Sequence, residues 1–147
     1  MKRLLYLPLY FLVLLSCSKD SQEVQSAAEF LNAGSGSFAG SWKLTEKEKV
    51  TIDDQKIWEP VSASQQYTMI LRYDGVILNA DGKPACCPPT SLIINDHLLD
   101  IKPQSPIPTN EACELVNCIN CLTWEIEFTG NQMIVTACNS PRMKFVR

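Results

Sequence analysis

The feature that most constrains this chain is a two-residue alternation of apolar and polar side chains, which starts near Phe38 and recurs to the C-terminus. The clearest example is the segment 122–129, where every second residue is apolar, namely Leu122, Trp124, Ile126 and Phe128. A period of two is typical of strands with one buried and one solvated face. Helical periodicity is absent after residue 37, so the sequence predicts an all-β domain.

Turn residues divide the alternating region into about eight short strands. The turn pairs are Asp53-Asp54, Asp74-Gly75, Asn95-Asp96 and Gly130-Asn131. Sequential antiparallel strands close most simply into a small up-and-down β-barrel, because closure leaves no exposed strand edge. A two-sheet sandwich is the alternative.

The first residues have the layout of a secretory signal. Lys2 and Arg3 precede an apolar stretch over residues 4–15, and Ser16 precedes Cys17. This end resembles the lipobox of bacterial lipoproteins, in which the chain is cut before the cysteine and the cysteine is acylated on its thiol and its new amino group. The resemblance implies a signal peptide at 1–16 and a membrane anchor through acyl chains on Cys17. A plain secreted protein is the alternative.

Residues 17–37 are predicted to be the lipidated cysteine and a linker, which could hold a short helix at 20–32 or remain flexible. The residues just after Cys17, Ser18-Lys19-Asp20-Ser21-Gln22-Glu23, resemble the export signal of surface-exposed lipoproteins in Bacteroidetes. This resemblance implies a place in the bacterial cell envelope, at the outer membrane.

The overall charge argues against two classes of partner. The formal net charge is −3 and the isoelectric point is about 5.1, and removal of residues 1–16 would take away Lys2 and Arg3 without removing an acid. Binding to nucleic acid needs a basic face, so we predict no nucleic-acid partner. Attachment to anionic lipid would have to come from acyl chains rather than from a basic patch.

The domain at 38–147 also carries a family resemblance. Gly40-Ser41-Trp42 at the head of the first strand resembles the Gly-x-Trp start of lipocalins. Tyr73-Asp74-Gly75, the blocks 124–128 and 131–135, and the terminal arginines resemble the small lipocalin-like lipoproteins of Bacteroidetes. The domain is shorter than a standard lipocalin and lacks the Thr-Asp-Tyr motif. The resemblance implies that Trp42 packs over the closed end of a barrel, under Arg142 or Arg147.

Lipocalin-like proteins bind a small apolar or amphipathic molecule in the barrel mouth, and the resemblance implies the same here. The inward candidates for the wall are Leu44, Glu46, Tyr67, Met69, Leu71, Trp124, Ile126 and Phe128. An eight-stranded barrel has room for at most one such ligand, or for none if side chains fill it. The alternative is therefore a filled barrel in a structural or interaction lipoprotein, with the loop 103–121 as the surface that contacts an envelope protein.

Two carboxylates on the first strand leave a choice open. Glu46 and Glu48 fall on the apolar positions of the alternation. A β-bulge near Glu46 would turn both outward. Without a bulge they would point into the barrel, where a carboxylate needs a partner or a ligand.

Six cysteines remain once Cys17 is lipidated, and their even number in an exported chain predicts three disulfides. The six are Cys86, Cys87, Cys113, Cys118, Cys121 and Cys138. Sequence cannot choose among the fifteen pairings, although adjacent Cys86 and Cys87 should reach different partners. The alternatives are a redox Cys118-x-x-Cys121 motif and a zinc site on Cys86, Cys87, Cys118 and Cys121.

No residue pattern here builds a catalytic centre. The chain has one histidine, His97, beside a predicted turn, which does not make a nucleophile–base pair with any serine or cysteine by sequence. We therefore expect a protein that is not an enzyme and uses no cofactor and no metal.

Overall fold

The computed structural model describes residues 37–147, so the predicted signal peptide, Cys17 and all of the predicted linker except residue 37 lie outside the described residues. Within the described part, regular structure consists of nine strands and one short 3₁₀ helix, η1, at Glu111–Leu115. This confirms the predicted all-β fold. No helix in residues 37–147 is long and apolar enough to cross a bilayer.

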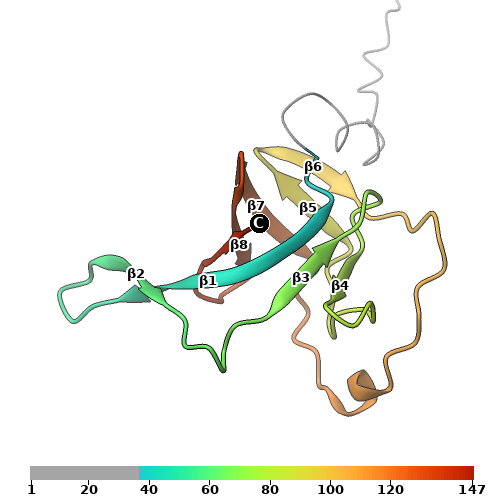
Figure 1. Cartoon of the computed structure of the whole chain (residues 1–147), viewed down its shortest axis with the longest axis horizontal. Helices are drawn as coiled ribbons and strands as arrows, with labels where there is room; N and C mark the ends of the chain where they lie inside the picture. The colour runs from blue at the N-terminus through green and yellow to red at the C-terminus, as the bar shows by residue number, and fades with distance from the viewer. Residues whose placement is uncertain (1–36) are drawn as a thin grey trace, which may run out of the picture.

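One curled sheet contains all the strands and forms a half-barrel (Figure 1). The strands are β1 Gly40–Val50, β2 Lys56–Pro60, β3 Thr68–Leu71, β4 Ile77–Asn79, β5 Ser91–Ile94, β6 His97–Asp100, β7 Thr123–Thr129, β8 Gln132–Ala137 and β9 Met143–Val146. Their order across the sheet is β4-β3-β1-β9-β8-β7-β5-β6, and β2 pairs with β1 off this path. The last strand therefore returns to the first, as in a small barrel.

The long first strand has two successive partners on the same side. Its first half, at 40–43, pairs with β3, and its second half, at 46–50, pairs with β2. The second half of β1 and β2 together form a two-stranded arm that extends beyond the rest of the sheet (Figure 1). We call residues 46–60 the arm.

The strand order differs from a sequential meander in one place. β5 pairs with β7 in parallel, with Ser91 opposite Thr123 and Ile94 opposite Ile126, and β6 lies outside β5. Parallel neighbours need a long crossover connection, and the segment 101–122 between β6 and β7 provides it. The two ends of the sheet are then β4 and β6, and we call the gap between them the seam.

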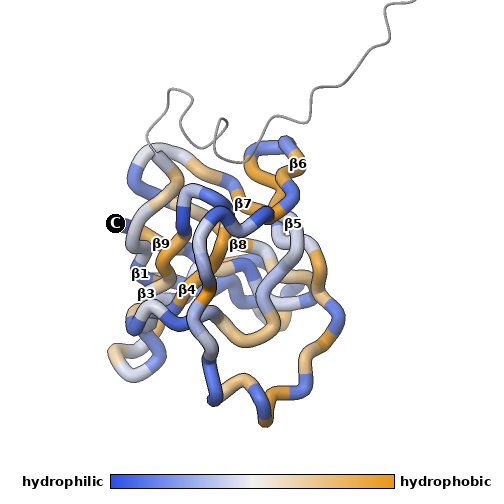
Figure 2. The backbone as a smooth tube through the Cα atoms, turned by 90° about the vertical axis from the view of Figure 1, so that its right-hand side faces the viewer, coloured by the Kyte–Doolittle hydropathy of each residue, from blue (hydrophilic) through white to orange (hydrophobic). Residues whose placement is uncertain are grey.

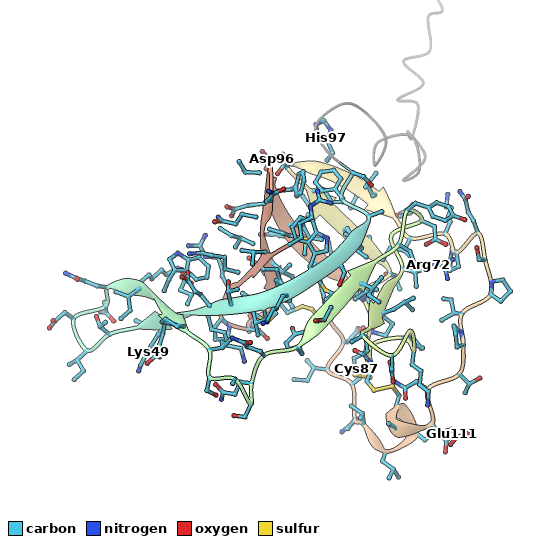
Figure 3. The ribbon with its side chains drawn as sticks, viewed as in Figure 1. Lys49, Arg72, Cys87, Asp96, His97 and Glu111 are labelled. Atoms are coloured by element: carbon cyan, nitrogen blue, oxygen red, sulfur yellow. A yellow bond between two sulfur atoms is a disulfide. The ribbon has the colours of Figure 1, made fainter. Side chains whose placement is uncertain are left out.

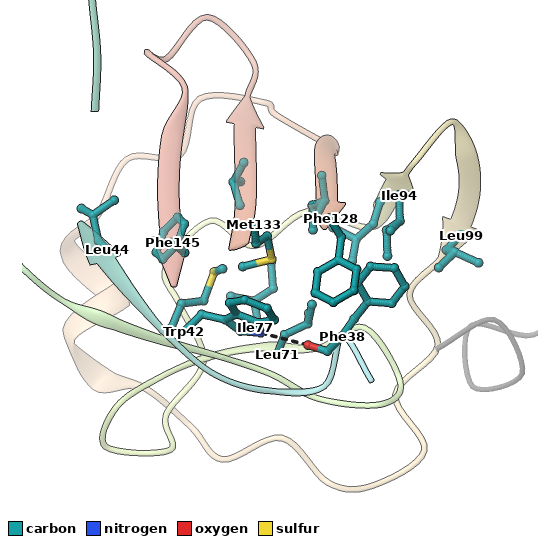
Figure 4. Close-up of a cluster of buried hydrophobic side chains, with 14 of the residues drawn as sticks. Phe38, Trp42, Leu44, Leu71, Ile77, Ile94, Leu99, Phe128, Met133 and Phe145 are labelled. Carbon is teal, nitrogen blue, oxygen red and sulfur yellow. Dashed lines mark hydrogen bonds between the residues drawn. The ribbon is translucent and has the colours of Figure 1, made fainter. Parts of the chain in front are cut away.

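The concave face of the sheet carries a continuous apolar core (Figure 4). Figure 2 shows hydrophobic and hydrophilic residues alternating along the strands, as the sequence pattern predicts. Trp42, Leu44, Met133 and Phe145 are completely buried in this core. Burial of such side chains is typically favourable by about 1.5–3 kcal/mol each, so the concave face supplies the main driving force for folding.

A tryptophan–arginine stack closes the end of the half-barrel where β1 begins. The guanidinium carbon of Arg147 lies 4.6 Å from the centroid of the Trp42 ring, and Trp42 Nε1 donates to the carbonyl oxygen of Phe38 at 2.9 Å. Phe128 meets the Trp42 ring edge-on, with centroids 5.6 Å apart. Gly40 has φ +146°, and a Cβ there would lie 3.6 Å from Arg147 Nη1. Of the two candidate arginines, Arg147 therefore covers Trp42.

Candidate functional site

Most residues predicted to line a ligand cavity lie in the packed core. Leu44, Met69, Leu71, Ile126 and Phe128 all belong to the buried cluster, and Trp124 packs against it. Tyr67 is 44% exposed, and its hydroxyl donates to the Met143 sulfur at 3.5 Å. A ligand in the barrel mouth would have to displace side chains that already fill the concave face.

The eighth predicted wall residue, Glu46, faces away from the core because β1 contains a bulge. The pairing of β1 with β9 shifts register between Leu44 and Glu46, so that Leu44 lies opposite Phe145 and Glu46 opposite Lys144. Glu46 forms an ion pair with Lys144. The bulge is thus the correct one of the two alternatives that the sequence left open.

The arm is held to β9 by an ionic cluster around Trp58. Nε and Nη2 of Arg142 both donate to Glu48 Oε1, at 3.0 and 2.7 Å. Lys144 Nζ lies 4.3 Å from the centroid of the Trp58 ring. The hydrogen bond from Arg142 lowers the pKa of Glu48 below its usual value, and the same bond raises the pKa of Arg142. These charges satisfy one another, so we assign the cluster a structural role.

A polar hollow of about 420 Å³ opens beside this cluster. Its lining residues are Glu48, Lys49, Val50, Lys56, Asn139, Ser140 and Pro141. The carboxylate of Glu48 is already engaged by Arg142, and Lys56 Nζ lies 3.9 Å from Glu48 Oε2. The third charged lining residue, Lys49, pairs with Glu59. Each charged residue that lines the hollow is therefore already in an ion pair.

A second hollow, of about 210 Å³, lies at the seam, and we call it the seam pocket. Its lining residues come from the start of β4, the segment before β5 and the segment after β6, namely Val76, Ile77, Pro84, Pro88, Pro89, Thr90, Ile101, Pro103 and Ile107. None of the eight residues predicted to bind a ligand lines it. The sequence analysis missed this pocket because its walls meet only when the sheet curls.

A buried arginine–aspartate pair fixes one wall of the seam pocket. The side chain of Asp74 is completely buried, and its Oδ2 accepts from Arg72 Nη2 at 2.5 Å and from the backbone N–H of Gln104 at 2.8 Å. Arg72 also donates to the carbonyl oxygens of Ser105 and Pro106, at 3.3 and 3.4 Å. Figure 3 shows Arg72 on the side where the segment after β6 passes. We call Arg72 and Asp74 the clamp.

The clamp also sets the charge state of its carboxylate. Burial alone would raise the pKa of Asp74, but the backbone N–H of Gln104, the guanidinium of Arg72 and the N–H of Val76 together hold it below its usual value. Asp74 is therefore an ionised carboxylate that ties the segment 104–106 to the turn before β4. The sequence marked Asp74-Gly75 only as a turn, and nothing local signals that its carboxylate is buried.

We expect acid to destabilise the domain through the clamp and the arm. Because the folded-state pKa values of Asp74 and Glu48 lie below the unfolded ones, their contribution is complete above the unfolded pKa, about 4, and is lost as the pH falls through the folded values. Thermal unfolding followed by circular dichroism between pH 3 and 7 should show a falling Tm. Asp74→Asn should lower the Tm at neutral pH and flatten its acid limb, whereas Asp53→Asn in an exposed turn should change neither. An unchanged acid limb in Asp74→Asn would contradict the role of the clamp.

Three disulfides join the cysteine-bearing segments, as predicted: Cys86–Cys113, Cys87–Cys118 and Cys121–Cys138. Adjacent Cys86 and Cys87 reach different partners, which confirms that expectation. Cys118 and Cys121 are bonded to different cysteines, so the alternative Cys118-x-x-Cys121 redox motif and the alternative zinc site on Cys86, Cys87, Cys118 and Cys121 are both wrong. The first two bonds connect the loop at 84–89 to the loop at 103–121. Only Cys121–Cys138 joins strand ends.

The loop at 103–121, which we call the cystine loop, exposes apolar side chains. Leu115 is 96% and Ile119 is 85% exposed, and Val116 is also exposed. Two acidic residues of η1, Glu111 and Glu114, lie beside them in sequence and are exposed too. Figure 2 shows hydrophobic residues at the lower end of the molecule, where this loop lies, and Figure 3 shows Cys87 and Glu111 at that same end. The loop is therefore an apolar and acidic surface held in place by two disulfides.

His97 is the only histidine in the chain and is exposed at the start of β6, beside the turn Asn95-Asp96. The described residues hold no cluster of three or more His, Cys, Asp or Glu side chains that could bind a metal ion.

No family model, no curated protein and no solved structure matches this chain.

Proposed function

We propose that this chain is an exported, lipid-anchored protein of the bacterial cell envelope that has no catalytic activity and binds another envelope protein. The observation that carries the proposal is the exposure of Leu115 and Ile119 on a loop fixed by two disulfides. Apolar residues presented on a rigid loop are typical of recognition surfaces. The packed concave face favours this function over a ligand in the barrel mouth.

The composition of the cystine loop indicates what kind of surface it fits. Glu111 and Glu114 precede the exposed apolar residues in η1, so the complementary surface is apolar with basic side chains beside it. The position of the loop agrees with an anchored protein. The start of β1, which follows the linker in sequence, lies in the upper part of Figure 1 and η1 at the bottom, so the loop would point away from the anchored side.

The proposed anchor rests on Cys17, which the Leu14-Leu15-Ser16-Cys17 end of the apolar stretch marks as the lipidated residue. The stack of Arg147 on Trp42 supports the resemblance of the domain to lipocalin-like lipoproteins of Bacteroidetes. We expect the protein purified from bacterial envelopes to begin at Cys17 and to carry fatty acyl mass, as measured by intact mass spectrometry. Cys17→Ser should move the protein from the detergent phase to the aqueous phase in a phase-separation assay. An unmodified Cys17 in envelope protein would remove the anchor from the proposal.

The binding function is tested by exchanging the apolar residues of the cystine loop. We expect wild-type protein, cross-linked in the intact envelope and purified, to carry a partner in a fixed ratio. Leu115→Ser/Ile119→Ser should lose this partner, because both substitutions remove apolar surface without touching a disulfide. Ile52→Ser is the matched control, since Ile52 is fully exposed at the tip of the arm, and it should retain the partner.

The dependence on ionic strength tests whether the acidic residues of the cystine loop contribute to binding. Because Glu111 and Glu114 lie beside the apolar residues, the yield of the partner should fall as the ionic strength rises, and Glu111→Gln/Glu114→Gln should weaken this dependence. A partner that the loop variant retains as well as the wild type, or the absence of any partner at a fixed ratio, would overturn the proposed function.

A further inference from the structure

The seam pocket has an almost entirely apolar lining. Eight of its nine lining residues are valine, isoleucine or proline, and the ninth is Thr90. None of the nine carries a charge. The Thr90 hydroxyl already donates to the carbonyl oxygen of Leu122 at 3.2 Å. Four of the lining residues are prolines, which have no backbone N–H to offer a ligand. A charged or strongly polar molecule would lose its hydration in this pocket and gain few hydrogen bonds in return.

The walls of the pocket are fixed by contacts on both sides. On one side, the clamp holds the segment 104–106, between lining residues Pro103 and Ile107. On the other side, the segment that carries Pro84, Pro88 and Pro89 also contains Cys86 and Cys87, and both cysteines form disulfides with the cystine loop. Asn110 Nδ2 joins the two sides by donating to the carbonyl oxygen of Pro84 at 2.8 Å. Such a preorganised site avoids most of the ordering that binding would otherwise require.

A glycine allows the turn before β4 to reach the pocket wall. Gly75 has φ +82°, and a Cβ at this position would lie 3.2 Å from Ile101 Cγ1. The turn that carries Asp74 can therefore pack directly on a lining residue. The pocket is thus bounded by segments that the clamp, the disulfides and this close approach all hold together.

Size selects the ligand. An apolar cavity of about 150 Å³ accommodates benzene, and the seam pocket measures about 210 Å³. We propose that the seam pocket is a binding site for a compact, neutral apolar molecule, a single aromatic ring with a small substituent or a branched hydrocarbon of that size. The pocket meets the core at Ile77 but contains none of the residues predicted to line the barrel mouth. The inference goes beyond the proposed function and does not depend on the cystine loop or on a protein partner.

The test is a titration of the oxidised full-length chain, carrying ¹³C-labelled isoleucine methyl groups, with toluene. We expect saturable shifts of the methyl resonances of Ile77, Ile101 and Ile107, which line the pocket, and no comparable shift at Ile57 or Ile119. Benzoate has the same ring with a negative charge, and we expect it to leave the resonances of the lining isoleucines unchanged.

A matched pair of variants tests whether toluene binds in the seam pocket. Ile107→Gln should weaken toluene binding about tenfold, because it adds an amide to an apolar wall. Ile57→Gln makes the same change at a residue of similar exposure on the arm, 45% against 41% for Ile107, and should leave the affinity unchanged. Non-saturating shifts, equal shifts at Ile119, or equal weakening by both variants would overturn the proposal. Should Ile107→Gln unfold, which the core methyl groups of Ile94 and Ile126 would report, the wild-type titrations with toluene and benzoate still decide it.

Discussion

Trp42→Ala is expected to lower the free energy of unfolding by about 3–5 kcal/mol. The ring is completely buried, Nε1 is hydrogen-bonded to Phe38, and Arg147 lies over one face. Truncation would open a cavity at the closed end of the half-barrel and would leave the Phe38 carbonyl without this donor. Because small domains are stable by only about 5–15 kcal/mol, this single change would remove a large share of the total. Chemical denaturation followed by fluorescence or circular dichroism measures it.

Trp58→Ala is the matched control for this prediction. Trp58 lies on the arm, is half-buried, and contacts the cationic groups of Lys144 and Arg142 rather than the core. We expect a loss of about 1 kcal/mol, the size of a cation–π contact near the surface plus a small apolar area. A loss in Trp42→Ala no larger than that in Trp58→Ala would show that the closed end does not anchor the fold.

The positions of strands and turns could be predicted because their causes are local. The alternation over 122–129 places Ile126 and Phe128 on one face whatever their partners are. The turn at Asn95-Asp96 is equally local, since both residues adopt positive φ, at 45° and 69°, which asparagine and aspartate tolerate better than most residues. The tryptophan–arginine stack was implied by the family resemblance, which left Arg142 and Arg147 open, and the structure places Arg147 over Trp42.

The strand order could not be predicted in the same way. The short apolar run at 91–94 fits a parallel or an antiparallel neighbour equally well. The choice of β7 as parallel partner depends on the path of the distant segment 101–122. The disulfide pairing has the same origin, because it depends on which loops the curled sheet brings together. Interactions between residues close in sequence therefore determine neither the strand order nor the disulfide pairing.

The seam pocket and the clamp could not be predicted from the sequence for a related reason. Asp74 stands in a turn, where a carboxylate is ordinarily solvated, and it is buried only because the segment 104–106 folds over it. The bulge in β1 is an intermediate case. The misplaced polarity of Glu46 and Glu48 signalled it in the sequence, and only the register with β9 decided it.

Removal of the two disulfides that link the same pair of segments is expected to destabilise the domain more than the separate losses would suggest. Cys86–Cys113 and Cys87–Cys118 close loops with sequence separations of 27 and 31 residues. With one bond present, the other closes only a short additional loop between the two bridges. Loop-closure entropy then gives about 2 kcal/mol for the loss of either bond, and about 5–6 kcal/mol for the loss of both.

This prediction is measured with serine pairs in urea denaturation, under conditions that keep the remaining bonds oxidised. Cys121→Ser/Cys138→Ser is the control, because that bond closes a separate loop with a sequence separation of 17 residues around β7 and β8. Its effect should add simply to that of either other pair, since independent cross-links share no loop. If the loss of both linked bonds equals the sum of the single losses, the two bridges do not act on one loop.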